Sequence, residues 1–412
     1  MNKILFISEY STYPENGFPL RSYFFANEIS KENKVCLCFG SFHHRLSAET
    51  HQKSNLYYKK NFSILSLKLF KSRQPSNFLP RFINWFIFAL KIFFIKKDDI
   101  GFIPNVIIYS SPTLVGFLGA YALSKRFNCK IYFEVRDIWP LSLHDILNVS
   151  KKNPIYILLQ LIEDFAYKRA SGVISSLRRL PVHIDKRIGN IKKDFLFLPN
   201  PLDIANLSEL KLTKLHSKDT NVLNHIISLQ NNGKKIVAYV GGIGPSNALD
   251  IFIKTASECE DKKVFWIIVG DGPDKNNLRE KCKNLDLKNI IFFEKVYPNS
   301  VHHILDKVDL LFLSNNFKEI YTYGISPIKL PEYLYSGTPI IHVTNSHSPL
   351  IDADCWSIVN SLETSEILKK VHKLLELDNK SLRMGSIKAK DYVDKELSLE
   401  RLTKKLITYL NK

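Results

Sequence analysis

Two loops in the second half of the chain contain residue types suited to binding a phosphate group. The first follows an apolar run and places three glycines within four positions, Gly241, Gly242 and Gly244, ahead of Pro245. Glycine lets backbone N–H groups approach a phosphate closely, but it also serves simply to turn the chain between a strand and a helix. The sequence leaves both interpretations of this loop open.

The second loop runs from Gly324 to Gly337 and leads into a short helical pattern. Ser326 and Pro327 are typical of a helix start, and Gly337 is typical of a helix end. Pro331 would remove a hydrogen bond from the interior of such a helix, so the alternative is a regular helix that begins nearer Pro331. Both alternatives place Lys329 at the N-terminal end of the helix.

Lys329 and Glu332 together would suit a nucleoside diphosphate. A diphosphate at this position would meet a cation and free backbone donors, and the glutamate could accept two hydrogen bonds from a ribose diol. Each residue also has a simpler explanation. The lysine could be a solvated charge, and the glutamate could be an acid that complements the helix dipole.

The elements that must position these residues follow from the alternation of short apolar runs with helical patterns. This alternation predicts an α/β protein with parallel sheets and two Rossmann-like halves. A length of 412 residues suits two domains of roughly 200 residues each. The expected strands lie at 4–8, 35–39, 106–109, 131–135 and 173–175 in the first half, and at 235–240, 265–269, 290–293, 310–313 and 339–343 in the second.

The domain boundary is expected where this pattern weakens. We predict a first domain at residues 1–203, a linker region at 204–232 and a second domain at 233–390. The linker ends at the turn signal Asn231-Asn232-Gly233.

Positive charge is concentrated in the first half. The net charge of the whole chain is +18, and residues 1–200 contribute +15 of it, from 29 Lys and Arg against 14 Asp and Glu. Part of this excess leads into the aromatic, apolar stretch Phe82–Ile95, which is shorter than the roughly 20 residues needed to cross a bilayer. A membrane-surface segment at about 56–97 and a buried core helix both fit. Nucleic acid is disfavoured, because no recognisable binding module is present.

The cysteines indicate no structural metal. None of the six lies in a C-x-x-C pair or at zinc-ligand spacing from histidines. Cys36 and Cys38 would share one face of a strand and fit an apolar core better than a metal site. Together with an N-terminus that lacks the pattern of a signal peptide, this predicts a reducing, cytoplasmic location and no metal cofactor.

A series of motifs in the second half resembles the donor domain of family-4 GT-B glycosyltransferases. The resemblance extends over about 150 contiguous residues and is strongest to the bacterial branch that builds O-antigen and capsule repeat units, including the N-acetylfucosamine-transferase-like subgroup. Looser matches in the first half lie at 134–140, 163–170 and 198–203. The motifs of the second half are Val269-Gly270-Asp271-Gly272-Pro273, Leu278, 289–293, Asp309-Leu310, 326–333 and 337–341.

This resemblance implies a retaining transfer of a sugar from a nucleotide-diphosphate donor, with UDP expected, to a lipid-linked glycan such as an undecaprenyl-diphosphate glycan. The first domain would bind the acceptor and the second the donor, at the inner face of the cytoplasmic membrane. No bound metal or other cofactor would be needed. The family also implies that a C-terminal helix, within residues 391–412, crosses back onto the first domain.

The resemblance also implies roles for individual residues. Asp137 and Lys329 would be catalytic, with Lys329 stabilising the leaving diphosphate. Asp137 could instead form a salt bridge with Arg136 or cap a helix. The donor-binding residues would be Gly241, Gly242, Gly244, Gly270, Gly324, Ser326, Pro327, Lys329, Leu330 and Glu332, and the acceptor-side residues would be Gly17, Arg21, Arg136 and Asp137.

The sequence departs from the family pattern at two places. Gly324 stands where many members have the first carboxylate of an E-x7-E pair, and residues 241–247 lack the usual cations. Lys329 would then carry more of the phosphate charge, or Arg21 would share it. Two other functions remain open: a non-hydrolysing UDP-sugar epimerase of the same architecture, and a non-catalytic scaffold in a polysaccharide assembly complex.

Overall fold

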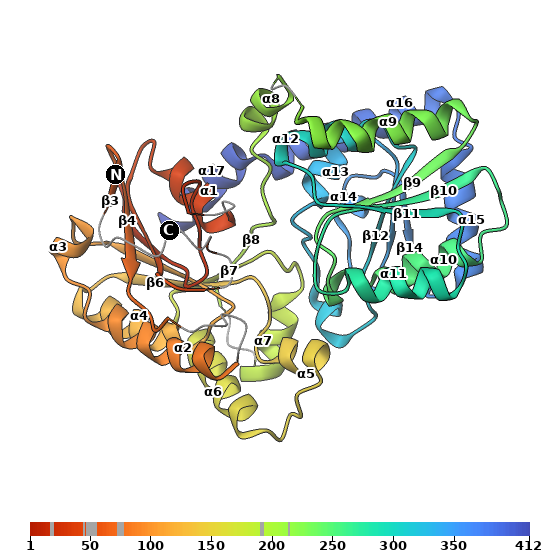
Figure 1. The fold of residues 1–412 in the computed structure, drawn as a ribbon. Coiled ribbons are helices and arrows are strands. Elements are labelled where there is room, and N and C mark those ends of the chain that lie inside the picture. The colour runs from red at the N-terminus through yellow and green to blue at the C-terminus, as the bar shows by residue number, and fades with distance from the viewer. Residues whose placement is uncertain (17–19, 44–45, 47–55, 72–77, 190–192, 213–214) are drawn as a thin grey trace. The chain divides into compact units, whose positions relative to one another are not determined.

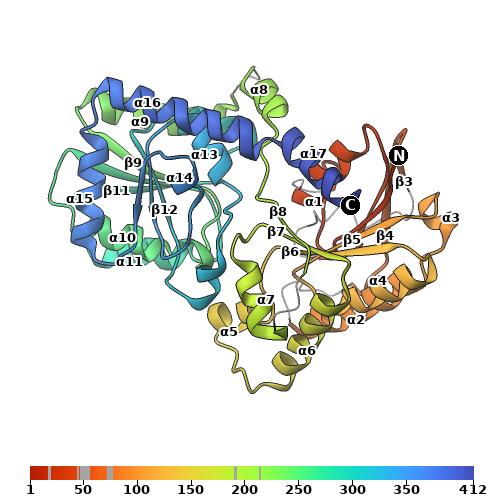
Figure 2. The ribbon, with the colours of Figure 1, turned by 180° about the vertical axis from the view of Figure 1, so that it is seen from behind.

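The structure, a computed structural model, describes residues 1–16, 20–43, 46, 56–71, 78–189, 193–212 and 215–412. The chain divides into two compact units (Figures 1 and 2). The first contains Met1–Pro199 and Leu399–Lys412, and the second contains Asn200–Ser398. Each unit is an α/β structure built on a largely parallel sheet, which confirms the predicted fold class.

The first unit contains an eight-stranded sheet in the order β3-β4-β2-β1-β5-β6-β7-β8. All neighbours are parallel except β3 and β4, which are antiparallel. Because parallel strands are covered on both faces, they read as continuous apolar runs in the sequence. The strands are β1 (Lys3–Ile7), β2 (Lys34–Gly40), β3 (Leu56–Lys59), β4 (Phe62–Leu67), β5 (Val106–Ser110), β6 (Lys130–Val135), β7 (Gly172–Ser175) and β8 (Phe195–Phe197).

Helices cover both faces of this sheet. Helices α1 and α17 lie together on one face, and α2, α4 and α6 lie on the other (Figure 1). The helices of the unit are α1 (Arg21–Ile29), α2 (Phe78–Phe93), α3 (Lys97–Ile100), α4 (Val115–Arg126), α5 (Leu141–Leu147), α6 (Pro154–Arg169), α7 (Leu180–Ile188) and α17 (Leu399–Leu410).

The C-terminal helix α17 belongs to the first unit although the preceding 199 residues belong to the second. Leu402 and Leu406 pack into the core between α1 and the sheet. Tyr409 donates a hydrogen bond to the backbone oxygen of Asp194, 2.9 Å away. The returning segment starts at Leu399 rather than at residue 391, because α16 (Asn379–Tyr392) and a π-helical turn at Val393–Leu397 still pack on the second unit.

The second unit contains a six-stranded parallel sheet in the order β11-β10-β9-β12-β13-β14. Its strands are β9 (Lys235–Val240), β10 (Val264–Val269), β11 (Ile290–Phe293), β12 (Leu310–Ser314), β13 (Ile340–Val343) and β14 (Ser357–Val359). Alternate side chains of these strands enter two separate apolar cores, one on each face. The remaining helices are α8 (Ile204–Leu212), α9 (Ser217–Asn231), α10 (Leu249–Ser257), α11 (Lys275–Asn284), α12 (Pro298–Leu305), α13 (Leu330–Ser336), α14 (Pro349–Asp352) and α15 (Thr364–Leu375), with short 3₁₀ turns at Pro245–Asn247 and Glu319–Tyr323.

The expected linker at 204–232 is wrong as a description of local structure. Most of this region forms α8 and α9, and Ile226 on α9 is fully buried in the core of the second unit. The units divide instead between Pro199 and Asn200. The sequence of α9 did not predict a helix because only one narrow stripe of the helix is buried against the sheet, so apolar residues recur weakly at the helical period.

Helix α2 corresponds to the apolar stretch Phe82–Ile95 and has two different faces. Trp85, Phe88 and Ile92 are buried, whereas Phe86 and Leu90 are 44% and 60% exposed. The core-helix interpretation is therefore correct for one face only. Among the described residues, no helix is long and apolar enough to cross a bilayer.

A glycine on α4 allows α2 and α4 to pack closely. At Gly119 on α4, a Cβ atom would lie 2.0 Å from the backbone oxygen of Ala89 on α2. The two helices can approach this closely only because Gly119 has no side chain.

We expect Gly119→Ala to destabilise the first unit by about 1–3 kcal/mol, because the added methyl group would push against backbone rather than against a movable side chain. Chemical denaturation with a folding probe in the first unit measures the change. Gly242→Ala is the control, because a Cβ there meets nothing within 4 Å. Equal stability of the two variants would show that α2 and α4 are not locked at this contact.

Candidate active site

The glycine loop after β9 runs beside the turn after β10. Gly241 donates a backbone hydrogen bond to Val269, at 2.9 Å, and Ile243 donates one to Asp271, at 2.8 Å. A Cβ at Gly270 would lie 1.9 Å from the backbone oxygen of Gly241, and Gly270 has a φ of +154°. The approach of the two backbones therefore accounts for Gly270 without a ligand.

The amine of Lys329 lies directly over Gly241. A Cβ on that glycine would be 2.9 Å from both Cε and Nζ of the lysine, so the missing side chain makes room for the cation. The amine donates hydrogen bonds to the Tyr239 hydroxyl and, at 3.0 Å, to Oδ1 of Asn247. It also lies 4.1 Å from the centre of the Tyr239 ring.

The surroundings of Lys329 contain neutral acceptors but no carboxylate that pairs with it among the described residues. Desolvation of this partly buried amine lowers its pKa from 10.5 to about 7. An anion brought to Nζ would restore the charged form, so the position favours an anionic ligand.

Glu332 lies one turn into the same segment, on α13. Burial raises the pKa of its carboxyl group from 4.5 to about 7, and no side chain in the described part of the chain pairs with it. The next residue, Tyr333, exchanges hydrogen bonds with the backbone N–H and C=O of Val240, at 2.7 and 2.8 Å. Tyr333 thereby holds the start of α13 against the carboxyl end of β9.

The regular helix begins at Leu330 with Lys329 as its N-cap residue, which confirms the alternative of a start nearer Pro331 and excludes Ser326 as the N-cap. The Ser326 hydroxyl instead accepts a hydrogen bond from the backbone N–H of Asn200, at 2.9 Å. The side-chain amide of Asn200 donates to the Ser326 backbone oxygen. This pair attaches the loop before α13 to the start of the second unit.

The other residues expected to bind the donor lie along the same segment or in the glycine loop. Gly324 ends the turn Glu319–Tyr323 with a φ of +114°. Pro327 accepts the backbone hydrogen bond of Leu330, whose side chain is buried in the core and can offer a ligand only backbone atoms. Gly242 and Gly244 have open space where a Cβ would stand, apart from the ring of Pro273 at 3.9 Å from the latter.

Polar side chains also follow β12 and β13 at the same edge of the sheet. Asn315 and Ser346 are almost fully buried, and each retains a side-chain oxygen without a hydrogen bond in the structure. His347 bonds to Asp352 at 3.0 Å. These residues place further hydrogen-bonding groups near the ends of the central strands, where open parallel sheets bind ligands.

In the first unit, the expected acceptor contact through Arg21 is wrong. Its side chain is buried and bonds to Glu134 at 2.8 Å and to the backbone oxygens of Leu198 and Pro199. A guanidinium held by a carboxylate and two carbonyls is occupied as an internal clamp. Arg21 therefore cannot share the charge of a diphosphate without giving up these bonds.

Asp137 follows the carboxyl end of β6 and is exposed. Neither simpler explanation for it holds, since no ion pair joins it to Arg136 within the described residues and the N-cap of α5 is Pro140. The backbone N–H groups of Arg136 and Asp137 point to the Ser111 hydroxyl, at 2.9 and 3.5 Å. The predicted acceptor-side residue Gly17 lies outside the described residues.

Sequence reasoning missed Tyr239, Asn247 and Tyr333 as residues of this site. Tyr239 was interpreted only as part of an apolar strand, and Asn247 as part of a loop without cations. Both bond to the Gly242 backbone oxygen as well as to Lys329. A tyrosine just before a glycine-rich loop, with an asparagine just after it, was the available signal.

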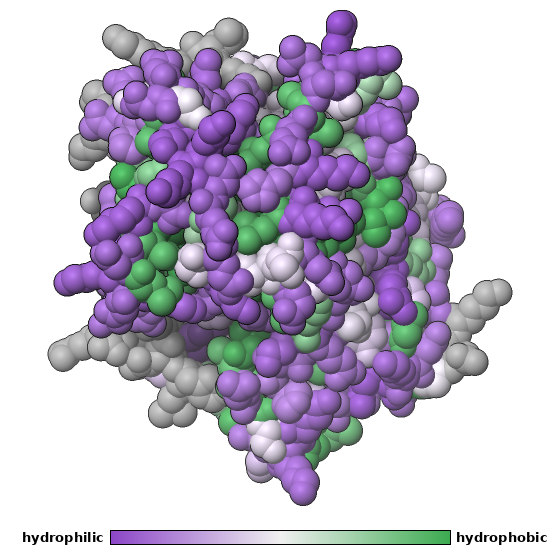
Figure 3. Space-filling view, turned by 90° about the vertical axis from the view of Figure 1, so that its right-hand side faces the viewer, coloured by the Kyte–Doolittle hydropathy of each residue, from purple (hydrophilic) through white to green (hydrophobic). Residues whose placement is uncertain are grey.

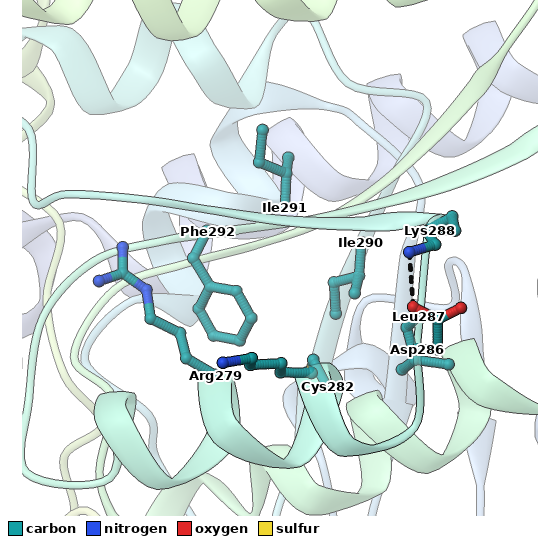
Figure 4. A pocket seen from close by; sticks show the side chains of 9 residues that line it. Arg279, Cys282, Asp286, Leu287, Lys288, Ile290, Ile291 and Phe292 are labelled. Atoms are coloured by element: carbon teal, nitrogen blue, oxygen red, sulfur yellow. Dashed lines mark hydrogen bonds and ion pairs between the residues drawn. The ribbon is translucent and has the colours of Figure 1, made fainter.

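A hollow lies between α11 and the edge strand β11 (Figure 4). It encloses about 360 Å³ and is lined by residues such as Arg279, Cys282, Lys283 and Phe292. It includes the loop 286–288, which leads into the amino end of β11, whereas Lys329 lies at the carboxyl ends of the strands. Among the described residues, no group of three or more His, Cys, Asp or Glu could hold a metal ion.

Comparison with known sequences finds a family match within the second unit. Residues 223–391 match the model of the family described as glycosyl transferases group 1. The chain is also 26% identical over 227 residues to the putative colanic acid biosynthesis glycosyl transferase WcaI of Escherichia coli, covering 55% of this chain and 54% of WcaI. It is 24% identical over 152 residues to the alpha-monoglucosyldiacylglycerol synthase of Streptococcus pneumoniae, covering 37% of this chain and 33% of that protein. The matches thus span about half or less of these relatives.

Solved structures resemble the whole chain. HepE of Anabaena, crystallised with UDP and glucose, has a TM-score of 0.65 at 15% identity, with all of both chains covered. WaaG, a glycosyltransferase involved in lipopolysaccharide biosynthesis, has a TM-score of 0.60 at 14% identity, with 99% of each chain covered. At these identities the likeness establishes the fold. Residues 223–391 thus match the group 1 glycosyl transferase model, and the chain as a whole has the GT-B fold.

Proposed function

We propose that this protein transfers a sugar, with retention of configuration, from a UDP-sugar to a lipid-linked oligosaccharide during the synthesis of a surface polysaccharide. The observation that carries the proposal is the amine of Lys329, which lies over Gly241 at the carboxyl end of β9 without a pairing carboxylate among the described residues. The glycosyl transferase match of residues 223–391 and the relatives named for colanic acid and lipopolysaccharide synthesis support it.

In this proposal Lys329 stabilises the diphosphate of the donor. The bond between the anomeric carbon and the diphosphate oxygen breaks, and charge develops on the leaving group. A cation that is already in place lowers the energy of that charge without reorganising at the moment of reaction. Tyr239 and Asn247 position the amine, and no metal ion is needed for this role.

Glu332 is proposed to accept hydrogen bonds from the ribose hydroxyls. Glu332 follows Lys329 by three residues at the start of α13, and we propose that a ribose and its attached diphosphate bridge the two side chains. Asn315 and Ser346 offer unpaired oxygens at the neighbouring strand ends, and we propose that they face the donor sugar.

The acceptor would be held by the first unit, where the exposed carboxylate of Asp137 has no partner among the described residues. We propose that Asp137 bonds to a sugar hydroxyl of the donor or acceptor. The acceptor oxygen forms the new bond to the anomeric carbon on the face from which the diphosphate departs, and its proton passes to the departing phosphate oxygen. The lipid-linked acceptor, an undecaprenyl-diphosphate glycan, would place the protein at the cytoplasmic membrane surface.

We expect Lys329→Ala to lower kcat/KM by on the order of 100-fold or more, as typically follows the loss of one preorganised electrostatic contact. It should also abolish the rise in Tm that UDP produces, which corresponds to about 2.7 kcal/mol at 100 times Kd. Lys283→Ala, an exposed lysine beside the hollow of Figure 4, is the matched control. Retention of full activity and UDP response by the Lys329 variant would remove this residue from the site.

The affinity for a UDP-sugar should be highest near pH 7. Above about pH 7 the free protein loses the Lys329 proton that the diphosphate requires, and below it Glu332 becomes protonated and loses its charge. Each side should weaken binding by up to tenfold per pH unit, because one proton is linked to binding on each side. Calorimetry of UDP-glucose binding measures this profile.

Lys329→Gln should flatten the alkaline side of the profile, and Glu332→Gln should flatten the acid side. An alkaline side that is unchanged in Lys329→Gln would mean that another group titrates there.

The loss of the Asn247 amide should act through Lys329. Asn247→Ala removes a hydrogen bond to the ammonium group, and such bonds contribute about 1.5–3 kcal/mol, so kcat/KM should fall by about tenfold or more. Because Oδ1 favours the protonated amine, its removal should also move the alkaline side of the profile to lower pH. A lowered Tm with an unmoved pH profile would indicate that Asn247 only supports the loop.

A further inference from the structure

The outer surface of the first unit carries a continuous stripe of exposed apolar side chains on α2. Ile83, Phe86, Leu90 and Phe93 are 39–60% exposed, at intervals of three or four residues, so they lie on one side of the helix. Phe94 extends the stripe just beyond the helix and is 60% exposed. The opposite side of α2 is buried, so this stripe is the part of the helix left for another surface.

The neighbouring helices extend this apolar face. Helix α4 packs against both α2 and α6, and the three helices lie side by side on one face of the sheet (Figures 1 and 2). Leu118 on α4 and Leu161 on α6 are 39% and 62% exposed, and Ile157 and Leu158 on α6 are also exposed. Exposed apolar residues on three adjacent helices exceed the single, scattered ones that are normal on monomers.

The second unit offers a contrast. Its surface on the side shown in Figure 3 is mainly hydrophilic, with hydrophobic side chains in small separate groups. On α16, Met384 and Ile387 are 52% and 53% exposed, but no comparable row continues from them within the described residues.

Within α2, α4 and α6 the charges are almost all positive, although the exposed Asp98 follows Lys97 just beyond α2. Helices α2 and α4 contain no acidic residue, and α6 contains two, Glu163 and Asp164. Glu163 is buried and bonds to Tyr167 and His183, and Asp164 pairs with Arg187 at 2.7 Å. The three helices therefore present no exposed, unpaired carboxylate.

Exposed cations stand at the ends of these helices. They are Lys96 and Lys97 after α2, Lys125 and Arg126 at the end of α4, Lys151 and Lys152 before α6, and Lys168 and Arg169 at its end. Arg126 bonds to backbone oxygens at the end of α2 and lies 5.7 Å from the Phe93 ring. An apolar stripe with a cationic rim is complementary to the acyl chains and anionic headgroups of a bilayer surface.

We infer that the outer face of α2, α4 and α6 docks on an anionic membrane, with Phe86 and Leu90 inserted among the lipids. This inference rests on the proposed function and deepens it, because it names the surface that meets the membrane. On its inner side, Trp85 of α2 donates a hydrogen bond to the Tyr10 hydroxyl, at 2.8 Å. Tyr10 follows the carboxyl end of β1, so α2 connects the docking face to the edge of the sheet where substrates bind.

The test is cosedimentation of the full chain with vesicles that contain phosphatidylglycerol, and with vesicles of phosphatidylcholine alone. The double variant Phe86→Gln and Leu90→Gln changes exposed side chains only and keeps good helix formers. We expect it to partition at least tenfold less than the wild type into the anionic vesicles. The matched control, Met384→Gln and Ile387→Gln on α16, should partition like the wild type. High salt should weaken wild-type binding.

UDP binding is measured on all of these proteins, and it should be unchanged. Equal partitioning of the α2 variant and the wild type would overturn the inference, whether or not UDP binds. So would a concentration-dependent dimer that the α2 variant dissociates, because the face would then bind a second copy of the chain. If the wild type does not bind UDP, the proposed function is contradicted, and the vesicle result still tests membrane docking independently.

Discussion

The candidate site of the second unit depends on the Lys329 amine, which is partly removed from water and pairs with no carboxylate among the described residues. Desolvation lowers the pKa of Lys329 to about 7, and the fold sustains this cost through surrounding packing. Gly241 leaves room for the side chain, and Tyr239 and Asn247 orient its amine. Tyr333 then fixes the helix that carries it against the end of β9. These contacts with the end of the sheet hold the Lys329 amine in a position where a ligand can bind it.

The first unit shows the opposite outcome for a residue of the same charge. The buried guanidinium of Arg21 donates hydrogen bonds to Glu134 and to two backbone oxygens, so it is not available to a substrate. The residue that stays available is an acid, Asp137, which has an exposed carboxylate at the end of β6. Partners, more than residue types, decide which charged groups can act on a substrate.

The chain is held by hydrogen bonds on both sides of the boundary between Pro199 and Asn200, where the first unit ends and the second begins. Arg21 binds the backbone at Leu198 and Pro199, and Asn200 binds Ser326 in the loop that precedes Lys329. The chain returns through α17, where Tyr409 bonds to the backbone of Asp194 and occupies the space beside Gly172. A tyrosine in the last helix and an arginine in the first thus fix strand ends that are far away in the sequence.

Helix α2 performs two tasks because its two faces have different neighbours. The backbone of Ala89 packs against Gly119 of α4, and Trp85 donates a hydrogen bond to Tyr10 in the loop after β1. Phe86 and Leu90 are exposed to solvent. An apolar residue count would treat all of these as one hydrophobic segment. The helix period separates them into a face that supports the sheet and a face proposed to meet lipid.

The sequence by itself determined the class of the fold and ten of its strands, and it singled out the segment with Lys329 and Glu332 as a candidate site. These follow from local signals, since buried parallel strands read as apolar runs and glycines mark the strand-to-helix turns. It also indicated that Phe82–Ile95 is too short to span a membrane.

Only the tertiary structure decided which charges are free and which are occupied. The Arg21 clamp joins residues 113 and more positions apart, and the Lys329 contacts join residues 82 and 90 apart, so no local pattern reveals them. The helices at 204–231 were missed for a related reason, because α9 is held by one buried stripe against β9 rather than by its own propensity. Contacts between distant segments set burial, and burial sets which groups remain available for chemistry.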